Sequence, residues 1–533
     1  MKRVLLPFAV VLAIAPRAVG HVGSPNVFFE GRAGAYSVYA VVRPPAALPG
    51  AAQVSVRVRE PSARSVSLLP VLWQTGRQGS PLPVAAVRVP GETNLWSGEV
   101  WFLRPGSYTM RIGVEGGRET GEASVPVNVL GAPSQQMKPG LRAMLGISGL
   151  VLLLGAVWIV GGIAREGPLL PGAKPGIVDH ARGRRVAAVA ALVLAAGAAA
   201  GGMRWRNMDL AYRTQGLQKP EPVAAEVRAE TNRIIVELRQ AEQSLSLPSW
   251  AALAPDHGKL MHLFLVREPE LDAFAHLHPI RQDAHRFALE VPALPVGAYQ
   301  LYGDVTFENG ISQTLIARVS LPAPVGPAFA LPPLTTNFAA EAFCGFATNP
   351  ASNPGPVARD MDDSWHVGRG GPLTSALSHS EGEKRLAGGG VVARLMGGYS
   401  LLFENAGAVA AGYETLLRFA AFSPDGREAT LQPYMGMLGH AAVRRQDGSV
   451  FAHLHPLGSF SMASQEVFRQ RETRSGADNP GSAKSVPPAN TPANRVSFPY
   501  QFPKPGQYRL WIQVRIAGRV LTAVYDIEIK LEK

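Results

Sequence analysis

The stretch that decides the fold is Phe274-Ala-His-Leu-His-Pro279, which recurs unchanged as Phe451-Ala-His-Leu-His-Pro456. The chain has 533 residues and only 12 histidines, so chance does not produce this identity. Side chains alternate between the two faces of a β-strand. Each copy, read as a strand, therefore places its two histidines on one face. Two imidazoles on one face are half of a metal site.

A third histidine precedes each copy. Asp256-His-Gly-Lys-Leu-Met-His262 aligns without gaps on Tyr434-Met-Gly-Met-Leu-Gly-His440. Asp447-Gly448 is a strong two-residue hairpin signal, and a hairpin centred there places His440 opposite His455. The first copy has a longer turn and a less certain register. The predicted groups are His262, His276 and His278, and His440, His453 and His455.

Further side chains can complete the two sites. His257 or Met261 is the candidate for the first site, and Met435 or Met437 for the second. His21 is a separate candidate, because cleavage of an export signal after Gly20 would leave it at the mature N-terminus. Its amine and imidazole would then chelate one ion together.

Copper is the expected metal and zinc the second choice. Imidazole suits both metals, and methionine thioether selects Cu(I). The single cysteine, Cys344, cannot build a closed thiolate zinc site. A general base is not found in both copies, which argues against a metal-dependent oxidase or hydrolase. The protein is therefore expected not to be an enzyme. The alternative is a structural or interaction protein whose histidines hydrogen bond to one another or to the backbone.

The N-terminus predicts export. Met1-Lys2-Arg3 is charged, residues 4–15 are apolar, and Ala18-Val19-Gly20 fits a cleavage site, so residues 1–20 are read as a signal peptide. The net charge of +12 is scattered over the chain. No aromatic and basic strip accompanies it, so nucleic-acid binding is not expected.

Two uncharged apolar segments, 143–164 and 186–203, predict a transmembrane hairpin. The loop 165–185 is rich in arginine, which is typical of a cytoplasmic loop. We therefore expect anchoring in a bacterial inner (cytoplasmic) membrane, with the remaining domains on the extracytoplasmic, periplasmic side.

The rest of the chain is predicted to be mainly β. Tyr108, Tyr299 and Tyr508 each follow a glycine turn near the end of a strand-rich region, as in the tyrosine corner of immunoglobulin-like folds. Three immunoglobulin-like or cupredoxin-like β-sandwiches are predicted, over 21–132, 221–323 and 386–533. The segments 324–385 and 466–494 are rich in Pro, Gly, Ser and Asn, and predict a flexible linker and a disordered insertion.

The strings Asp256–His262 and Phe274–Pro279 together resemble the HGK-x-MH…F-x-HLHP pattern of CopC/YtkA-like exported bacterial β-sandwich proteins. The resemblance covers the two C-terminal sandwiches. It implies copper handling by a binding protein, for tolerance, storage or delivery to a cuproenzyme, with a copper transporter as another possible partner. The second copy departs from the pattern, since Met435 replaces the first histidine, and this predicts unequal sites.

Overall fold

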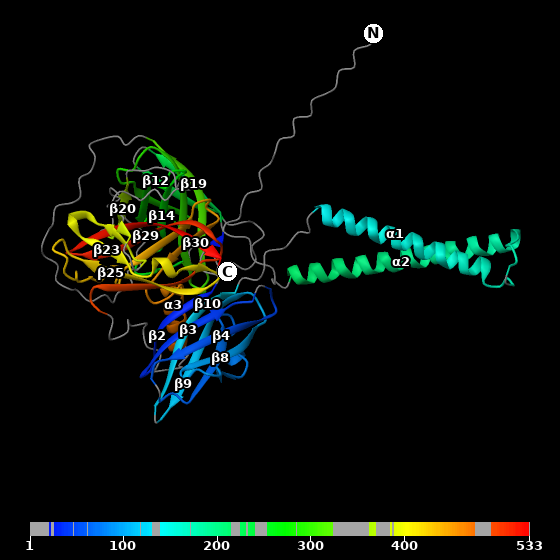
Figure 1. Ribbon diagram of the computed structural model, residues 1–533, viewed down its shortest axis with the longest axis horizontal. Helices are drawn as coiled ribbons and strands as arrows, with labels where there is room; N and C mark the ends of the chain where they lie inside the picture. Colours follow the sequence, from blue (N-terminus) through cyan, green and yellow to red (C-terminus); the bar gives the residue numbers. More distant parts are fainter. Residues whose placement is uncertain are drawn as a thin grey trace, which may run out of the picture.

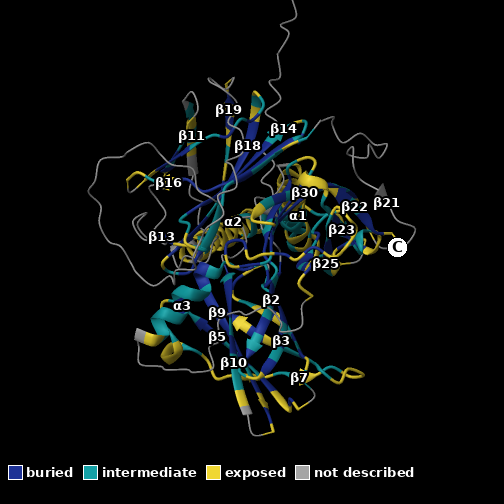
Figure 2. Ribbon diagram, turned by 90° about the vertical axis from the view of Figure 1, so that its left-hand side faces the viewer, coloured by how far each residue is buried: buried dark blue, intermediate teal, exposed yellow. Residues whose placement is uncertain are grey.

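A computed structural model describes residues 21–22, 26–45, 47–60, 62–117, 119–129, 139–170, 172–214, 224–230, 233–239, 253–283, 285–322, 362–368, 384–385, 389–474 and 492–531. The predicted signal peptide, 1–20, lies outside these residues. The fold is mainly β, with three two-sheet sandwiches and a separate pair of long helices (Figure 1). Buried residues are concentrated in the strands (Figure 2).

The first sandwich has an apolar core between two antiparallel sheets. One sheet contains β2 (Val27–Ala33), β3 (Tyr36–Arg43), β4 (Gly50–Val58), β8 (Leu95–Phe102) and β7 (Val87–Arg88). The other contains β10 (Glu119–Val129), β9 (Gly106–Gly116), β5 (Ser65–Leu72) and β6 (Val84–Ala85).

The second sandwich carries the first histidine hairpin. One sheet contains β11 (Ala224–Glu230), β12 (Arg233–Arg239), β17 (Arg286–Glu290) and β16 (Ile280–Arg281). The other contains β13 (Leu253–Ala254), β18 (Gly297–Phe307), β14 (His262–Glu268), β15 (Ala273–Leu277) and β20 (Ser364–Val367), with β19 (Ser312–Leu321) also paired to β18.

The third sandwich carries the second hairpin. One sheet contains β21 (Lys384–Arg385), β22 (Val391–Arg394), β23 (Ser400–Phe403), β25 (Glu414–Phe422) and β28 (Arg495–Gln501). The other contains β1 (His21–Val22), β27 (Val450–Leu454), β26 (His440–Arg445), β29 (Gly506–Ile516), β30 (Arg519–Leu531) and β24 (Ala410–Ala411). β1 pairs in parallel with β27, so the start of the described chain belongs to this sandwich and not to the first.

Each sandwich contains a tyrosine corner, as predicted. The hydroxyls of Tyr108, Tyr299 and Tyr508 donate to the carbonyl four residues earlier, at 2.9, 2.7 and 2.7 Å respectively. The same local device in three sandwiches supports the immunoglobulin-like interpretation.

The second and third sandwiches dock through the outer faces of their histidine hairpins. In β14 and β15 alternate residues such as Leu263 and Ala275 fill the sandwich core, while Phe264 and Phe274 face outward. The outward residues pack against the corresponding face of the third sandwich. Phe274 stacks on Trp511 (ring centroids 4.7 Å apart) and Tyr302 stacks on Phe451 (3.8 Å). Strand alternation thus gives each hairpin one face for its own core and one for the partner sandwich.

Two predicted irregular segments contain regular structure. Ser364–Val367, inside the predicted linker 324–385, forms β20 and pairs with β15. Ser364 is buried in this position and Trp365 is half-buried. Met462–Arg474 forms helix α3, which overlaps the predicted disordered insertion 466–494. Phe468 of this helix is buried and contacts Trp73 of the first sandwich edge to face, at 5.1 Å. Tertiary packing stabilises both segments despite their polar composition.

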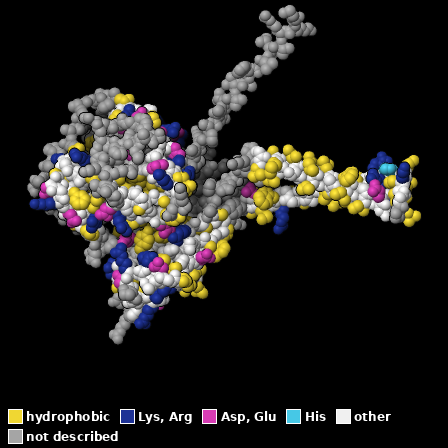
Figure 3. Space-filling view, in the orientation of Figure 1, with side chains coloured by type: hydrophobic (Ala, Val, Ile, Leu, Met, Phe, Trp, Pro, Cys, Tyr) yellow, Lys and Arg dark blue, Asp and Glu magenta, His cyan; other side chains and the backbone are white. Residues whose placement is uncertain are grey.

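Helices α1 (Pro139–Glu166) and α2 (Ile177–Thr214) form an antiparallel pair that extends away from the sandwiches (Figure 1). Both are long and apolar enough to cross a membrane, by length and composition. Their side chains are largely hydrophobic and exposed, and basic side chains lie at the far end (Figure 3). The two helices approach closely where Gly183 faces the carbonyl of Gly161. The connection is shorter than the predicted loop 165–185, because α2 already begins at Ile177.

Candidate metal centre

Seven of the 12 histidines lie together between the second and third sandwiches. We call them the histidine cluster: His257, His262, His276, His278, His440, His453 and His455. Neighbouring rings have centroids 4.4–6.2 Å apart, with His453–His455 the nearest pair and His257–His262 the farthest. The two predicted sites therefore meet in one place, which the sequence did not indicate.

His262, His276 and His278 form the first group, as predicted from the sequence. One ring nitrogen of each lies within 4.8 Å of the others, an arrangement that can hold a metal ion. Leu263 pairs with Leu277, so the next positions of the hairpin bring His262 opposite His278. All three side chains are buried.

A chain of hydrogen bonds fixes which nitrogen of His276 carries its proton. Tyr434 donates to the carbonyl of Asp362 at 3.0 Å, so the tyrosine oxygen is free to accept from Ser364. Ser364 must then accept from the amide of Gln513. The carbonyl oxygen of Gln513 is left as the acceptor for Nδ1–H of His276, at 2.9 Å. His276 is therefore protonated on Nδ1, and its Nε2 carries a lone pair.

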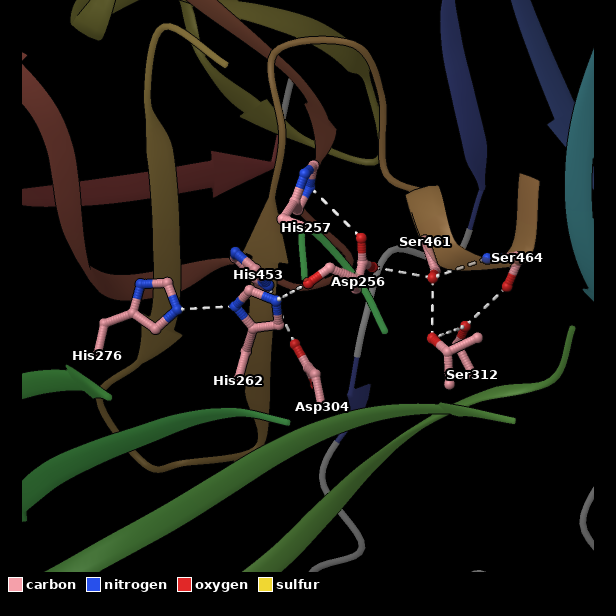
Figure 4. A network of polar contacts seen from close by, with 10 residues as sticks. Asp256, His257, His262, His276, Asp304, Ser312, His453, Ser461 and Ser464 are labelled. Atoms are coloured by element: carbon pink, nitrogen blue, oxygen red, sulfur yellow. Dashed lines mark hydrogen bonds and ion pairs between the residues drawn. The ribbon is translucent and has the colours of Figure 1, made fainter. Parts of the chain in front are cut away.

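The same reasoning applied to His262 leaves two lone pairs facing each other. Its Nε2 lies 3.2 Å from the carbonyl of Asp256, which can only accept, so Nε2 carries the proton. Nδ1 of His262 is then a lone pair, 3.1 Å from Nε2 of His276. Two nitrogens bound to one tetrahedral metal at about 2.0–2.1 Å lie about 3.3 Å apart. This pair therefore has the spacing of two ligands of one ion (Figure 4).

The acidic side chain directly before β20 orients His278, the third member of the first group. Asp363 accepts from both the backbone N–H and Nδ1–H of His278, at 2.8 and 2.9 Å. Nε2 of His278 is buried without a hydrogen-bond partner among the described residues. A carboxylate on the far nitrogen of a histidine is a common support for metal ligation.

The second group differs from the prediction. It contains His440 and His455 of the third sandwich with His257 of the second, and one ring nitrogen of each lies within 4.8 Å of the others. Both ring nitrogens of His440 and Nε2 of His455 are buried without hydrogen-bond partners among the described residues. Such groups cost about 1–3 kcal/mol each when left unpaired.

A tight turn delivers His257 across the boundary between sandwiches. Asp256 and Lys259 close the turn with two backbone hydrogen bonds of 2.8 and 2.9 Å, and both central residues, His257 and Gly258, have positive φ (51° and 83°). A residue other than glycine is uncommon in this region of φ, although histidine is found there more often than most. The ring centroid of His257 lies 5.3 Å from that of His455.

The remaining predicted residues have other positions. His453 is not in the second group, and its Nδ1 lies 3.2 Å from Oδ2 of Asp304 in the second sandwich. Met261 is fully buried in the core of the second sandwich, and its role as a ligand stays a prediction.

Met435 and Met437 lie in a turn that matches the one at His257. Met435 holds the corresponding position, with φ of 48°, and Met437 closes the turn with Tyr434. Both methionine side chains are buried, and their role as ligands stays a prediction. The backbone of His21 pairs with Val450, and its side chain lies outside the described part of the structure.

Burial sets the charge of the cluster. Desolvation lowers the pKa of His262, His276, His440 and His455 well below the ordinary value of 6.5, and the neighbouring histidines lower it further. The pKa of His257 is also lowered by burial, and Asp256 opposes this. These five rings are therefore neutral at pH 7, which is the form that binds a metal.

Asp304, Asp363 and Gln513 support the cluster and were missed from the sequence. Asp304 and Gln513 occupy matching places, since Asp304 pairs with His262 across β14 and β18, and Gln513 pairs with His440 across β26 and β29. Alignment of the two sandwiches would have found this pair. Asp363 had a weaker signal: it stands in Asp362-Asp-Ser-Trp-His366, a run of chemistry-bearing residues within an otherwise low-complexity segment.

Comparisons with known proteins add little. A family described as a domain of unknown function, DUF8832, matches residues 394–530, which is most of the third sandwich. The sequence has no match among curated proteins. Similar solved structures include dimeric latent PorU from Porphyromonas gingivalis, at 7% identity and TM-score 0.13, covering 91% of this chain and 32% of that one. Another is trypsin-activated alpha-2-macroglobulin from Escherichia coli, at 9% identity and TM-score 0.15, covering 96% of this chain and 24% of that one. The chain spans a third or less of their lengths, and the likeness is too weak to relate fold or function.

Proposed function

We propose that this chain is a membrane-anchored, extracytoplasmic copper-binding protein that serves copper tolerance, storage or delivery to a cuproenzyme. The observation that carries the proposal is the pair of lone pairs on His262 and His276, which face each other at 3.1 Å in a buried and neutral site. A bound cation turns this repulsive contact into two ligand bonds. Neither ring nitrogen of His440 has a hydrogen-bond partner among the described residues, so the single lone pair of its neutral ring is available to a second ion.

Copper is preferred to zinc because of the ligand chemistry. Each group offers imidazoles, which suit both metals in their neutral form. Met435 stands in a turn whose counterpart delivers a histidine to the cluster, and a thioether there favours Cu(I). The supporting carboxylate of Asp363 already bonds Nδ1 of His278, so it orients a ligand instead of acting as a base.

Helices α1 and α2 supply the proposed membrane anchor, and the basic residues at their connection favour the cytoplasmic side for it. The histidine cluster would then lie outside the cytoplasm, in the periplasm of a bacterium. A copper transporter or a cuproenzyme is the proposed partner. Ions would pass between proteins by ligand exchange.

The test is metal binding by the full chain in detergent. We expect about two Cu ions per chain from competition titration, with zinc bound more weakly. His276→Ala/His278→Ala should remove one ion and His440→Ala/His455→Ala the other. His285→Ala is the matched control, because this exposed histidine lies outside the cluster. If the protein retains no copper after loading, and copper does not change its unfolding midpoint, the histidines have a structural role only.

A further inference from the structure

His453 belongs to neither histidine group but lies beside both. Its ring centroid is 4.4 Å from that of His455 and 5.6 Å from His440 in the second group. It is also 5.5 Å from His262 and 5.5 Å from His276 in the first. Figure 4 shows His453 beside His262, together with Asp304, which contacts His453.

One nitrogen of His453 is held and the other is uncommitted. Nδ1 lies 3.2 Å from Oδ2 of Asp304, and since a carboxylate only accepts, Nδ1 carries the proton. In the neutral ring, which is the form that binds a metal, the lone pair then lies on Nε2. Nε2 is buried with no hydrogen-bond partner among the described residues, and only 7% of the His453 side chain is exposed. A buried lone pair without a partner costs about 1–3 kcal/mol, and a metal ion would remove that cost.

The repeat shows how His453 differs from its counterpart. His276 holds the same place in the first hairpin, and its Nδ1 is likewise held by the partner sandwich, through Gln513. Nε2 of His276, however, already faces Nδ1 of His262 in the first group. The place that His453 would fill in the second group is taken by His257, which crosses from the other sandwich. His453 is thereby left between two three-histidine groups.

We propose that His453 is a single exchange ligand shared by the two groups, an inference that rests on the proposed copper-binding function. A neutral imidazole protonated on Nδ1 has one lone pair, so His453 binds one ion at a time. The first ion to enter gains four imidazoles. The second ion has three and keeps an open coordination position. Transfer of the His453 lone pair from one ion to the other would reverse which ion is tightly held, without movement of either sandwich.

The test compares stepwise copper binding by the full chain and by His453→Gln, which keeps a polar side chain of similar length. The wild-type chain should bind its first ion at least about tenfold more tightly than its second, by analogy with the effect of support residues on metal affinity. His453→Gln should still bind two ions, with the first weakened about tenfold or more and the second unchanged. X-ray absorption at one equivalent of copper should show four imidazoles in the wild type and three in the variant.

The possible failures are separable. A wild-type chain that takes up no copper overturns the proposed function itself. Two ions bound identically by the wild type and by His453→Gln overturn the shared ligand alone, as does complete loss of one ion, which would make His453 an ordinary member of one group. Asp304→Asn provides a second variant: it keeps an acceptor for Nδ1–H and should weaken the first ion less than His453→Gln does. His285→Ala again serves as the control.

Discussion

His262 and His276 each carry their proton on the ring nitrogen that faces away from the other ring. His262 is fixed by the carbonyl of Asp256 and His276 by Gln513, whose own orientation is set through Ser364 and Tyr434. The facing nitrogens are thus both acceptors. At the scale of single residues, hydrogen bonds that lie outside the pair leave two lone pairs facing each other, as the proposed copper site requires.

These neutral rings predict how the stability of the metal-free protein depends on pH. Burial lowers the pKa of His262, His276, His440 and His455 in the folded state, below the value of 6.5 expected in the unfolded chain. Above pH 6.5 both states are neutral and stability is complete. As pH falls below 6.5 the unfolded chain takes up protons first, so the free energy of unfolding should decrease by up to about 1.4 kcal/mol per pH unit for each histidine.

Urea unfolding of the metal-free chain between pH 7.5 and 5 measures this dependence. His440→Phe, which fills a similar volume without a titrating group, should give a shallower decrease than the wild type. Stability that stays flat from pH 7.5 to 5.5 in the wild type would show that the rings are accessible to protons in the folded state.

At the scale of elements, the two matched turns explain the composition of the groups. Both are closed by paired backbone hydrogen bonds, and both place a non-glycine residue at positive φ, His257 in one and Met435 in the other. The turn of the second sandwich reaches the histidines of the third. The second group therefore combines side chains of both sandwiches, and its geometry depends on how they dock.

His257→Asn tests the contribution of this turn. Asparagine tolerates positive φ better than most residues, so the turn should persist while the imidazole is lost. We expect binding at the second group to weaken by about tenfold or more, with the first group and the unfolding midpoint nearly unchanged. His257→Ala is the companion variant and should also lower stability, because alanine is strained at this φ. Equal loss of both ions in His257→Asn would contradict separate groups.

Much of this arrangement could be predicted from the sequence, and the reason lies in local periodicity. Alternation along Phe274–Pro279 places His276 and His278 on one face, and the repeat of the glycine turn before Tyr299 and Tyr508 indicates related sandwiches. His257 belongs to the second group and not to the first because of how the two folded sandwiches dock. That is a property of their surfaces, which no short pattern contains. The helix over Met462–Arg474 was missed for a similar reason, since its stability comes from burial against other domains.

At the scale of the whole molecule, a polar contact secures the docking of the two histidine sandwiches. Arg444 of the third sandwich is almost completely buried, donates to the hydroxyl of Tyr302 at 3.1 Å and pairs with Glu268, both in the second. Glu268 also has Arg318 as a partner at 3.5 Å, so it is partly compensated without Arg444.

Breaking a buried ion pair typically costs about 3–5 kcal/mol. Because Glu268 keeps Arg318 as a partner, Arg444→Ala should destabilise the docked state by less, about 2–3 kcal/mol. Because His257 reaches the second group only in the docked state, that group should lose affinity more than the first. Hydrogen exchange of β14 and β26, together with copper titration, measures both effects. Arg427→Ala is the surface control. An unchanged ratio of the two copper affinities would show that docking does not depend on this contact.

The pairing of β1 with β27 also bears on the order in which the molecule is made. The segment that ends the second hairpin continues to Phe460, which packs in the core of the first sandwich against Phe29, with ring centroids 5.7 Å apart. β1, from the start of the described chain, pairs with β27 at the other end of the sequence. During synthesis the first sandwich is made long before either partner exists. Its core and the sheet that receives β1 are completed only near the end of translation, a long-range closure that is slow in folding and leaves apolar surface exposed in the meantime.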